Sequence, residues 1–98
     1  MFIKFIEIYH DFDIKLNCLK YHLRQVVVNK KNIVSFIETN YYGNVDAELL
    51  PQGLLYDQKY VRLKMVEDKL IDVVGDVDHI YKLLETDSQL NHRQTLKG

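Results

Sequence analysis

The fold is decided by residues 59–74, which read KYVRLKMVEDKLIDVV. Between residues 60 and 66 apolar and charged side chains alternate with a period of two, which is typical of a strand with one buried face. The charged residues 67–69 then favour a turn, and residues 70–74 form a second apolar run. The sequence therefore predicts an antiparallel hairpin that ends at Gly75.

A short helix is predicted directly after this hairpin. Asp76 is a helix-capping residue, because its carboxylate can accept hydrogen bonds from the free amides of the first turn. Four apolar residues follow at the spacing of one helix face: Val77, Ile80, Leu83 and Leu84. We predict a helix over residues 76–85 that packs on one face of the sheet. Residues 86–98 are mostly polar, and we expect them to form a flexible tail.

Further strand segments precede the hairpin, at residues 2–9, 26–29 and 33–39. In residues 12–25 the apolar positions are even up to Cys18 and odd from Leu19. This inversion favours two strands with a turn or bulge near Cys18 and Leu19, because one extra residue flips every later side chain. A helix is the alternative, because five apolar residues also lie at helical spacing: Phe12, Leu16, Leu19, Leu23 and Val26.

The fold class that follows is α+β and β-rich, in a single domain over residues 1–85. We expect a curved, mostly antiparallel sheet of five to six strands, or a partial barrel, with one C-terminal helix. A chain of 98 residues is too short for a second core of ordinary size. A small sheet leaves edges that self-association can cover. Residues 2–9 are apolar at both odd and even positions, so both faces of this strand are apolar, and we predict a homo-oligomer.

Composition narrows the classes of partner. A net charge of -1 creates no field that would draw the chain to nucleic acid or anionic lipid. No apolar run is long enough for a membrane span. Cys18 is the only cysteine, which excludes an internal disulfide and favours a reducing, cytoplasmic location. A nucleic-acid role would need a local strip such as Lys20, His22 and Arg24, which acidic residues elsewhere offset.

Two small groups of residues could carry chemistry. His10, Asp11 and Asp13 are metal-ligand types, but a solvated turn is the better interpretation without a second cluster. Cys18 and His22 are the minimum for thiol catalysis, although a buried, inert cysteine is more typical. Phosphate-binding glycine loops and Ser-His-Asp arrangements do not occur. We therefore expect no enzyme activity, no metal and no cofactor.

The order of segments resembles a known family. A strand ending in Val28-Asn29, a tight turn into residues 32–38, the 59–74 hairpin and a capped helix are similar to the FlbD-like small proteins of bacteria and phages. The resemblance covers Val26 to Leu84 and rests on the apolar pattern. It implies this fold and protein binding without a catalytic residue; flagellar members are associated with swarming motility. The 40–57 loop is longer than the family's link, and residues 12–25 have no counterpart.

Tyrosines mark the most promising surface, because seven occur in the chain and four lie around the 40–57 loop. A tyrosine offers a large contact area with few torsions to order, although the same residues can simply cap a sheet edge. The predicted partner-binding residues are Tyr41, Tyr42, Asp46, Glu48, Tyr56 and Tyr60.

From this surface we expect a non-enzymatic binding module, such as a phage or mobile-element accessory protein that inhibits a host defence protein. One alternative is a protein that sequesters a nucleotide signal, with Lys30, Lys31 or Arg62 on the phosphates and tyrosines on the bases. Another is a flagellar or structural accessory protein.

Overall fold

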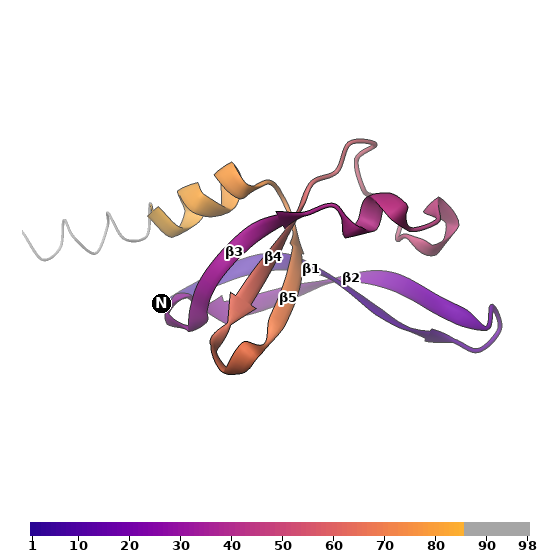
Figure 1. The fold of residues 1–98 in the computed structure, drawn as a ribbon, viewed down its shortest axis with the longest axis horizontal. Helices are drawn as coiled ribbons and strands as arrows, with labels where there is room; N and C mark the ends of the chain where they lie inside the picture. Colours follow the sequence, from indigo (N-terminus) through magenta and orange to yellow (C-terminus); the bar gives the residue numbers. More distant parts are fainter. Residues whose placement is uncertain (86–98) are drawn as a thin grey trace, which may run out of the picture.

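The computed structural model describes residues 1–85; the predicted tail at residues 86–98 lies outside the described residues. The chain forms a sheet, short 3-10 turns and one helix at residues 77–85 (Figure 1). The strands are β1 (Phe2–Asp13), β2 (Cys18–Asn29), β3 (Ile33–Thr39), β4 (Tyr60–Met65) and β5 (Leu70–Val74). The turns are η1 (Lys30–Asn32), η2 (Tyr41–Asn44), η3 (Ala47–Leu49) and η4 (Val66–Asp68).

The five strands lie in the order β2-β1-β5-β4-β3, and every neighbouring pair is antiparallel. This confirms the β-rich α+β class, the 59–74 hairpin and the strand at residues 33–39. The sheet has five strands and is open, with β2 and β3 at its edges. The partial barrel therefore stays a prediction.

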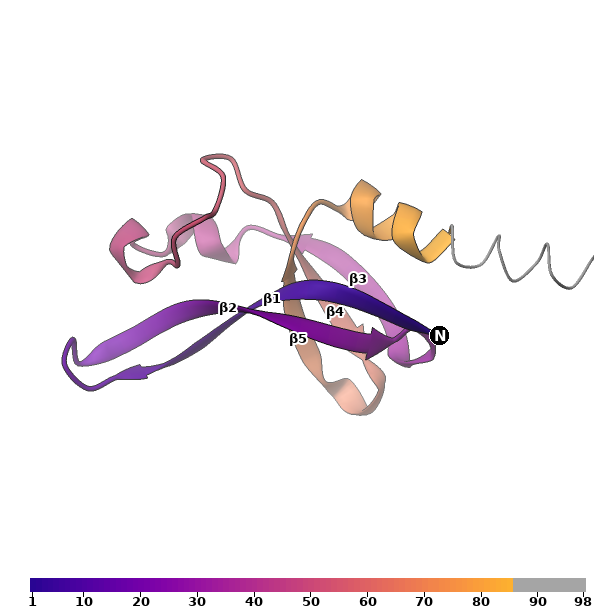
Figure 2. The same ribbon diagram turned by 180° about the vertical axis from the view of Figure 1, so that it is seen from behind.

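A long hairpin of β1 and β2 dominates the molecule. It pairs without interruption from Phe2 opposite Asn29 to Asp13 opposite Cys18. By contrast, β1 pairs with β5 only at Glu7 and Ile8. Figures 1 and 2 show the consequence: the distal half of the hairpin extends past the other three strands.

The hairpin confirms two strands over residues 12–25 and excludes the helix, but the predicted turn position is wrong. The turn lies at residues 14–17, and residues 10–13, expected as a polar turn, belong to β1. Asp13 pairs with Cys18, so an even residue always faces an odd one across this hairpin. The inversion of apolar parity at residues 18–19 is therefore a result of the pairing itself and needs no bulge.

An aliphatic cluster fills one side of the sheet. Its buried members are Phe5, Val28, Val61, Leu63, Met65, Ile71, Val73 and Ile80. Ile80 comes from the helix, and the other three residues of the predicted helical stripe pack against the same cluster. The Asp76 carboxylate accepts a hydrogen bond from the His79 amide at 2.7 Å. The predicted cap and the predicted apolar face of the helix are thus both confirmed.

A second, tyrosine-rich cluster lies on the opposite side of the sheet. Its buried members are Ile8, Tyr21, Tyr42 and Tyr60. Ile8 and Phe5 differ in parity along β1, as do Tyr60 and Val61 along β4, so the two clusters occupy opposite faces. The 40–57 loop folds over this second cluster through half-buried Leu49, Leu50 and Leu54. The β1–β2 hairpin contributes to both clusters. Phe5 and Val28, near its open end, belong to the aliphatic cluster, and Ile8 and Tyr21, nearer its tip, belong to the tyrosine-rich cluster.

Candidate functional site

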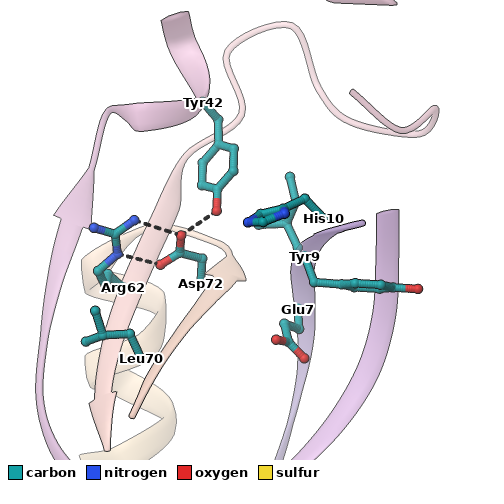
Figure 3. Close-up of a pocket in the computed structure, with 8 residues that line it drawn as sticks. Glu7, Tyr9, His10, Tyr42, Arg62, Leu70 and Asp72 are labelled. Atoms are coloured by element: carbon teal, nitrogen blue, oxygen red, sulfur yellow. Dashed lines mark hydrogen bonds and ion pairs between the residues drawn. The ribbon is translucent and has the colours of Figure 1, made fainter. Parts of the chain in front are cut away.

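A polar pocket of about 340 Å³ opens where β1 leaves β5 (Figure 3). Its lining comes from β1, β4, β5 and the start of the 40–57 loop: Glu7, Ile8, Tyr9, His10, Tyr42, Arg62, Leu70 and Asp72. Arg62 and Asp72 are directly opposed in the β4–β5 ladder, which places their side chains on one face of the sheet. Figure 3 shows this pair on one wall, with Glu7, Tyr9 and His10 on the other.

The Asp72 carboxylate is the centre of a hydrogen-bond network. Arg62 donates to both of its oxygens, from Nε at 2.8 Å and from Nη2 at 3.0 Å. The Tyr42 hydroxyl donates to Oδ2 of the same carboxylate. Burial and this hydrogen bond raise the pKa of Tyr42, and the hydrogen bond to Asp72 raises the pKa of Arg62. Both carboxylate oxygens are engaged, so the network fastens the loop residue Tyr42 to the sheet.

Four aromatic rings extend from this anchor across the second cluster. Tyr42 lies at centroid distances of 4.6 Å from Tyr60, 5.1 Å from Tyr41 and 5.5 Å from Tyr21. The hydroxyls of Tyr21 and Tyr41 are hydrogen-bonded at 2.9 Å. Burial, followed by this hydrogen bond, raises the pKa of Tyr21 to about 12. Tyr21 was not among the predicted site residues, because nothing in the sequence shows which strand tyrosine faces the loop.

The predicted partner-binding residues fall into two groups. Tyr42 and Tyr60 are buried in the second cluster. Tyr41 is half exposed, Tyr56 is fully exposed, and both predicted acidic residues, Asp46 and Glu48, are exposed. The buried pair therefore supports the loop, while the other four residues lie on its surface. Leu55, which the sequence did not single out, is also exposed on this loop.

The surface of the loop over residues 40–58 is negatively charged. Residues 40–58 contain Asp46, Glu48 and Asp57 and no lysine or arginine. The turn η3 carries Glu48, and half-buried Leu49 and Leu50 at its end pack down onto the second cluster. The backbone of η3 is therefore held while Glu48, and Asp46 just before the turn, are exposed. We define the acidic loop surface as five exposed residues of this segment: Tyr41, Asp46, Glu48, Leu55 and Tyr56.

The structure does not assemble the predicted phosphate-binding residues. The Arg62 guanidinium donates two hydrogen bonds to the Asp72 carboxylate, from Nε and from Nη2. The Lys30 ammonium donates to the Leu84 carbonyl at 2.9 Å, near the end of the described helix. Lys31 lies in the exposed turn η1, while Arg62 lies within β4 opposite Ile37. Lys30 and Lys31 thus share η1 while Arg62 lies on β4, and both Lys30 and Arg62 are engaged.

The strip of Lys20, His22 and Arg24 faces acidic and aromatic residues of β1. Arg24 donates to Glu7 at 2.8 Å, which raises the pKa of Arg24, and its guanidinium lies 4.2 Å from the centre of the Tyr9 ring. His22 is hydrogen-bonded to Asp11 at 2.7 Å. Lys20 is also opposite Asp11 in the ladder. Acidic residues of β1 therefore balance the positive charge of this strip, and the strip offers no uniformly basic face for a phosphate backbone.

The structure also shows where the possible metal ligands and the Cys18–His22 pair lie. Among residues 1–85 no group of three potential metal ligands comes together. Asp11 binds His22, and Asp13 accepts a hydrogen bond from the Leu16 amide at 3.0 Å. Cys18 is a half-buried free thiol, and His22 lies four residues along the same strand. At about 3.3 Å per residue that separation is roughly 13 Å, which is beyond hydrogen-bond reach.

A second exposed surface, which the sequence analysis did not predict, lies at the tip of the long hairpin. Its large apolar side chains are highly exposed: Phe12 at 57%, Ile14 at 86%, Leu16 at 53% and Leu19 at 42%. The turn beneath them is ordered by the Asp13 to Leu16 hydrogen bond and by Asn17, whose φ of 53° is in the left-handed region. Asparagine tolerates that region better than most residues. A tight turn that exposes Ile14 and Leu16 presents a preformed apolar knob.

Comparison with protein-family models, with curated proteins and with solved structures found no match to this chain. The FlbD-like resemblance therefore stays a hypothesis. Among the described residues no helix has the length and hydropathy that crossing a bilayer requires.

Proposed function

We propose that this protein is a non-enzymatic binding module that recognises a basic surface of a partner protein through its acidic loop surface. The observation that supports this most is the combination of exposed tyrosines and carboxylates on a loop anchored from below. Tyr42 and the half-buried leucines hold the loop backbone, so the backbone loses little further freedom when the loop binds a partner. Three carboxylates without a cation in residues 40–58 complement lysine and arginine on a partner.

The biological setting that we propose is inhibition of a host defence protein by a phage or mobile-element accessory protein. A defence protein that acts on nucleic acid carries a basic surface, which the acidic loop surface would complement. Tyr41 and Tyr56 supply the large amphipathic area that dominates many interfaces, and Asp46 and Glu48 supply charge. A cytoplasmic location belongs to the same proposal.

The test is quantitative capture of proteins from a bacterial lysate on the immobilised chain. The variant Tyr41→Ala/Tyr56→Ala removes the exposed rings, and Asp46→Lys/Glu48→Lys reverses the charge. We expect the same basic protein to be retained by the native chain and lost at least tenfold by both variants. Lys64→Ala, an exposed residue of β4 away from the loop, is the matched control and should retain that protein.

Two results would contradict the proposal. One is a captured set that is identical for the native chain and both loop variants. The other is a rise in melting temperature with cyclic nucleotides, because only a ligand that binds the folded state raises it. That rise would support the nucleotide-sequestering alternative instead.

A further inference from the structure

The sheet ends in two edge strands, β2 and β3, and only one of these edges is protected. An unpaired edge presents a row of backbone N–H and C=O groups to which another strand can bind, so native proteins cover or charge it. The distal half of β2 carries Lys20, His22 and Arg24. Its proximal half, residues 26–29, lines a pocket of about 250 Å³ together with η4. The β2 edge is therefore charged along one half and bordered by a turn along the other.

The β3 edge lacks both kinds of protection within residues 1–85. The strand pairs with β4 alone, and Figure 1 shows it along the outer side of the sheet. Residues 33–39 read IVSFIET, with one charged side chain, Glu38, and no lysine or proline. Val34 and Ile37 are 62% and 64% exposed. This edge is therefore open to pairing with a further strand.

The regular part of β3 sets the length of such a pairing. A register shift between Ile33 and Ser35 interrupts the ladder with β4, and from Ser35 to Thr39 the ladder is regular. The same number of positions, five, joins β4 to β5 in this sheet. Only an extended backbone supplies donors and acceptors at the matching spacing, so the occupant of this edge is itself a strand.

The side chains of this stretch match a second copy of themselves. When two identical five-residue segments pair in antiparallel fashion, they overlap fully only if the central residue, Ile37, lies opposite its own copy. Ser35 then faces Thr39, and hydroxyl pairs of this kind favour cross-strand contact. Glu38 faces Phe36, so the one charge of the strand does not meet itself. The pairing thus joins aliphatic to aliphatic and hydroxyl to hydroxyl without opposing like charges.

The charges around this stretch do not keep two copies apart. The net charge of the chain is only -1, so the mutual repulsion of two copies is weak. The two cations of β4 that lie beside the stretch each have a carboxylate partner. Arg62 is paired with Asp72, and Lys64 lies 3.8 Å from Asp68. A second copy can therefore approach the β3 edge without placing unpaired cations side by side.

From these observations we infer that β3 is a dimerisation edge. The Ser35–Thr39 stretch of one copy pairs antiparallel with the same stretch of a second copy, and Ile37 meets Ile37 on the two-fold axis. The two sheets become one continuous sheet, and association stops at the dimer because the same edge is used by both copies. The interface is small, so the dimer forms weakly, at roughly ten to several hundred micromolar. This inference goes beyond the proposed function and uses no residue of the acidic loop surface.

Sedimentation equilibrium from low to several hundred micromolar measures the mass. The native chain should pass from monomer to dimer as its concentration rises. Ile37→Asp and Ile37→Lys each oppose like charges on the two-fold axis, and each should weaken dimerisation at least tenfold. Residue 37 is exposed, and circular dichroism and thermal unfolding verify that both variants are folded. Val27→Asp, at an exposed position of the β2 edge, is the matched control and should dimerise like the native chain.

Mixing the two charge variants tests the register. Residue 37 faces its own copy, so an equimolar mixture of Ile37→Asp and Ile37→Lys brings opposite charges together. The mixture should form a heterodimer at least tenfold more tightly than either variant associates alone. A mixture that stays as monomeric as its components would overturn the inferred pairing.

Other results would also overturn the inference. These are a native chain that is monomeric over the whole range, a dimer that persists unchanged in both variants of Ile37, and loss of the dimer in Val27→Asp. A mass that rises beyond the dimer would mean that unlike edges pair, and it too would contradict the two-fold contact. Asp46→Lys/Glu48→Lys should dimerise normally, so failure here and failure of the proposed function are distinguishable.

Discussion

The two clusters on either side of the sheet are built from different chemistry. The aliphatic cluster under the helix contains Leu63, Val61, Val73 and Ile80 at full burial and has no polar side-chain atom. The tyrosine cluster under the loop carries hydroxyls, and it needs Asp72 and Arg62 to satisfy one of them. The comparison indicates that the helix side is the source of stability. The loop side trades some of that stability for a surface that displays charged and aromatic groups.

The largest effect should come from the aliphatic side. Leu63→Ala removes a fully buried side chain and leaves a cavity, and it should lower the free energy of unfolding by about 2–5 kcal/mol. Urea unfolding monitored by circular dichroism measures this change. Leu55→Ala, at 69% exposure, is the control and should change stability by less than about 0.5 kcal/mol. Equal losses in the two variants would show that the aliphatic cluster is not the main core.

A smaller loss is expected on the tyrosine side. Asp72→Asn removes the charge that Arg62 and Tyr42 share, and it should cost about 2 kcal/mol because charge-assisted hydrogen bonds are lost. Hydrogen exchange should also accelerate in the 40–57 loop. Asp68→Asn breaks an exposed contact of 3.8 Å to Lys64 and should cost less than about 0.5 kcal/mol. Unchanged hydrogen exchange of the loop in Asp72→Asn would show that Asp72 does not anchor the loop.

Loss of the helix cap should lower the stability of the aliphatic side by a smaller amount. Asp76→Ala removes the acceptor for the His79 amide and should cost about 1 kcal/mol. Asp76→Asn retains a capping oxygen and should recover most of that loss. Thermal unfolding at neutral pH measures both variants. If Asp76→Asn is as unstable as Asp76→Ala, the effect arises from charge rather than from the cap.

A pH dependence of stability is expected from the tyrosine side. The pKa values of Tyr21, Tyr42 and Tyr60 are raised in the folded state, first of all by burial. Above pH 10 the unfolded chain loses these protons while the folded chain retains them, so stability is complete below pH 10 and falls as pH rises beyond it. Urea midpoints together with tyrosinate absorbance follow this change. An unchanged midpoint up to pH 11 would contradict it.

One substitution isolates a single contribution to this titration. Tyr41→Phe removes the hydroxyl that bonds to Tyr21, so the Tyr21 pKa should move from about 12 part of the way back toward 10. Tyr56→Phe, at an exposed position, should leave the Tyr21 titration unchanged.

Local pattern was sufficient for much of the fold. The 59–74 hairpin, the strand at residues 33–39, the Asp76 cap and the Ile80 stripe follow from side-chain period and capping chemistry, which act over a few residues. The turn at residues 14–17 was missed because Ile14 and Leu16 occupy it, and turns usually carry polar residues there. The sequence therefore placed Phe12 to Cys18 in a strand and had no reason to expect an apolar tip.

The candidate site was harder to predict, because it depends on contacts between distant segments. Tyr41 and Tyr42 are neighbours, yet one is half exposed and the other is buried against Asp72. Only the packing of the loop on β5 decides which ring points inward. Arg62 was selected as a phosphate ligand for its charge, and only the strand register shows that Asp72 lies opposite it.

The narrow junction between β1 and β5 bears on how quickly the chain can fold. β1 and β5 lie near opposite ends of the described chain and pair at only two residues of β1. The β1–β2 hairpin, by contrast, forms between segments that are adjacent in the sequence. Closing so large a loop costs entropy before those few contacts compensate for it, which is typical of folding on a millisecond-to-second timescale. We therefore expect the pairing of β5 with Glu7 and Ile8 to be a late step in folding, after the β1–β2 hairpin has formed.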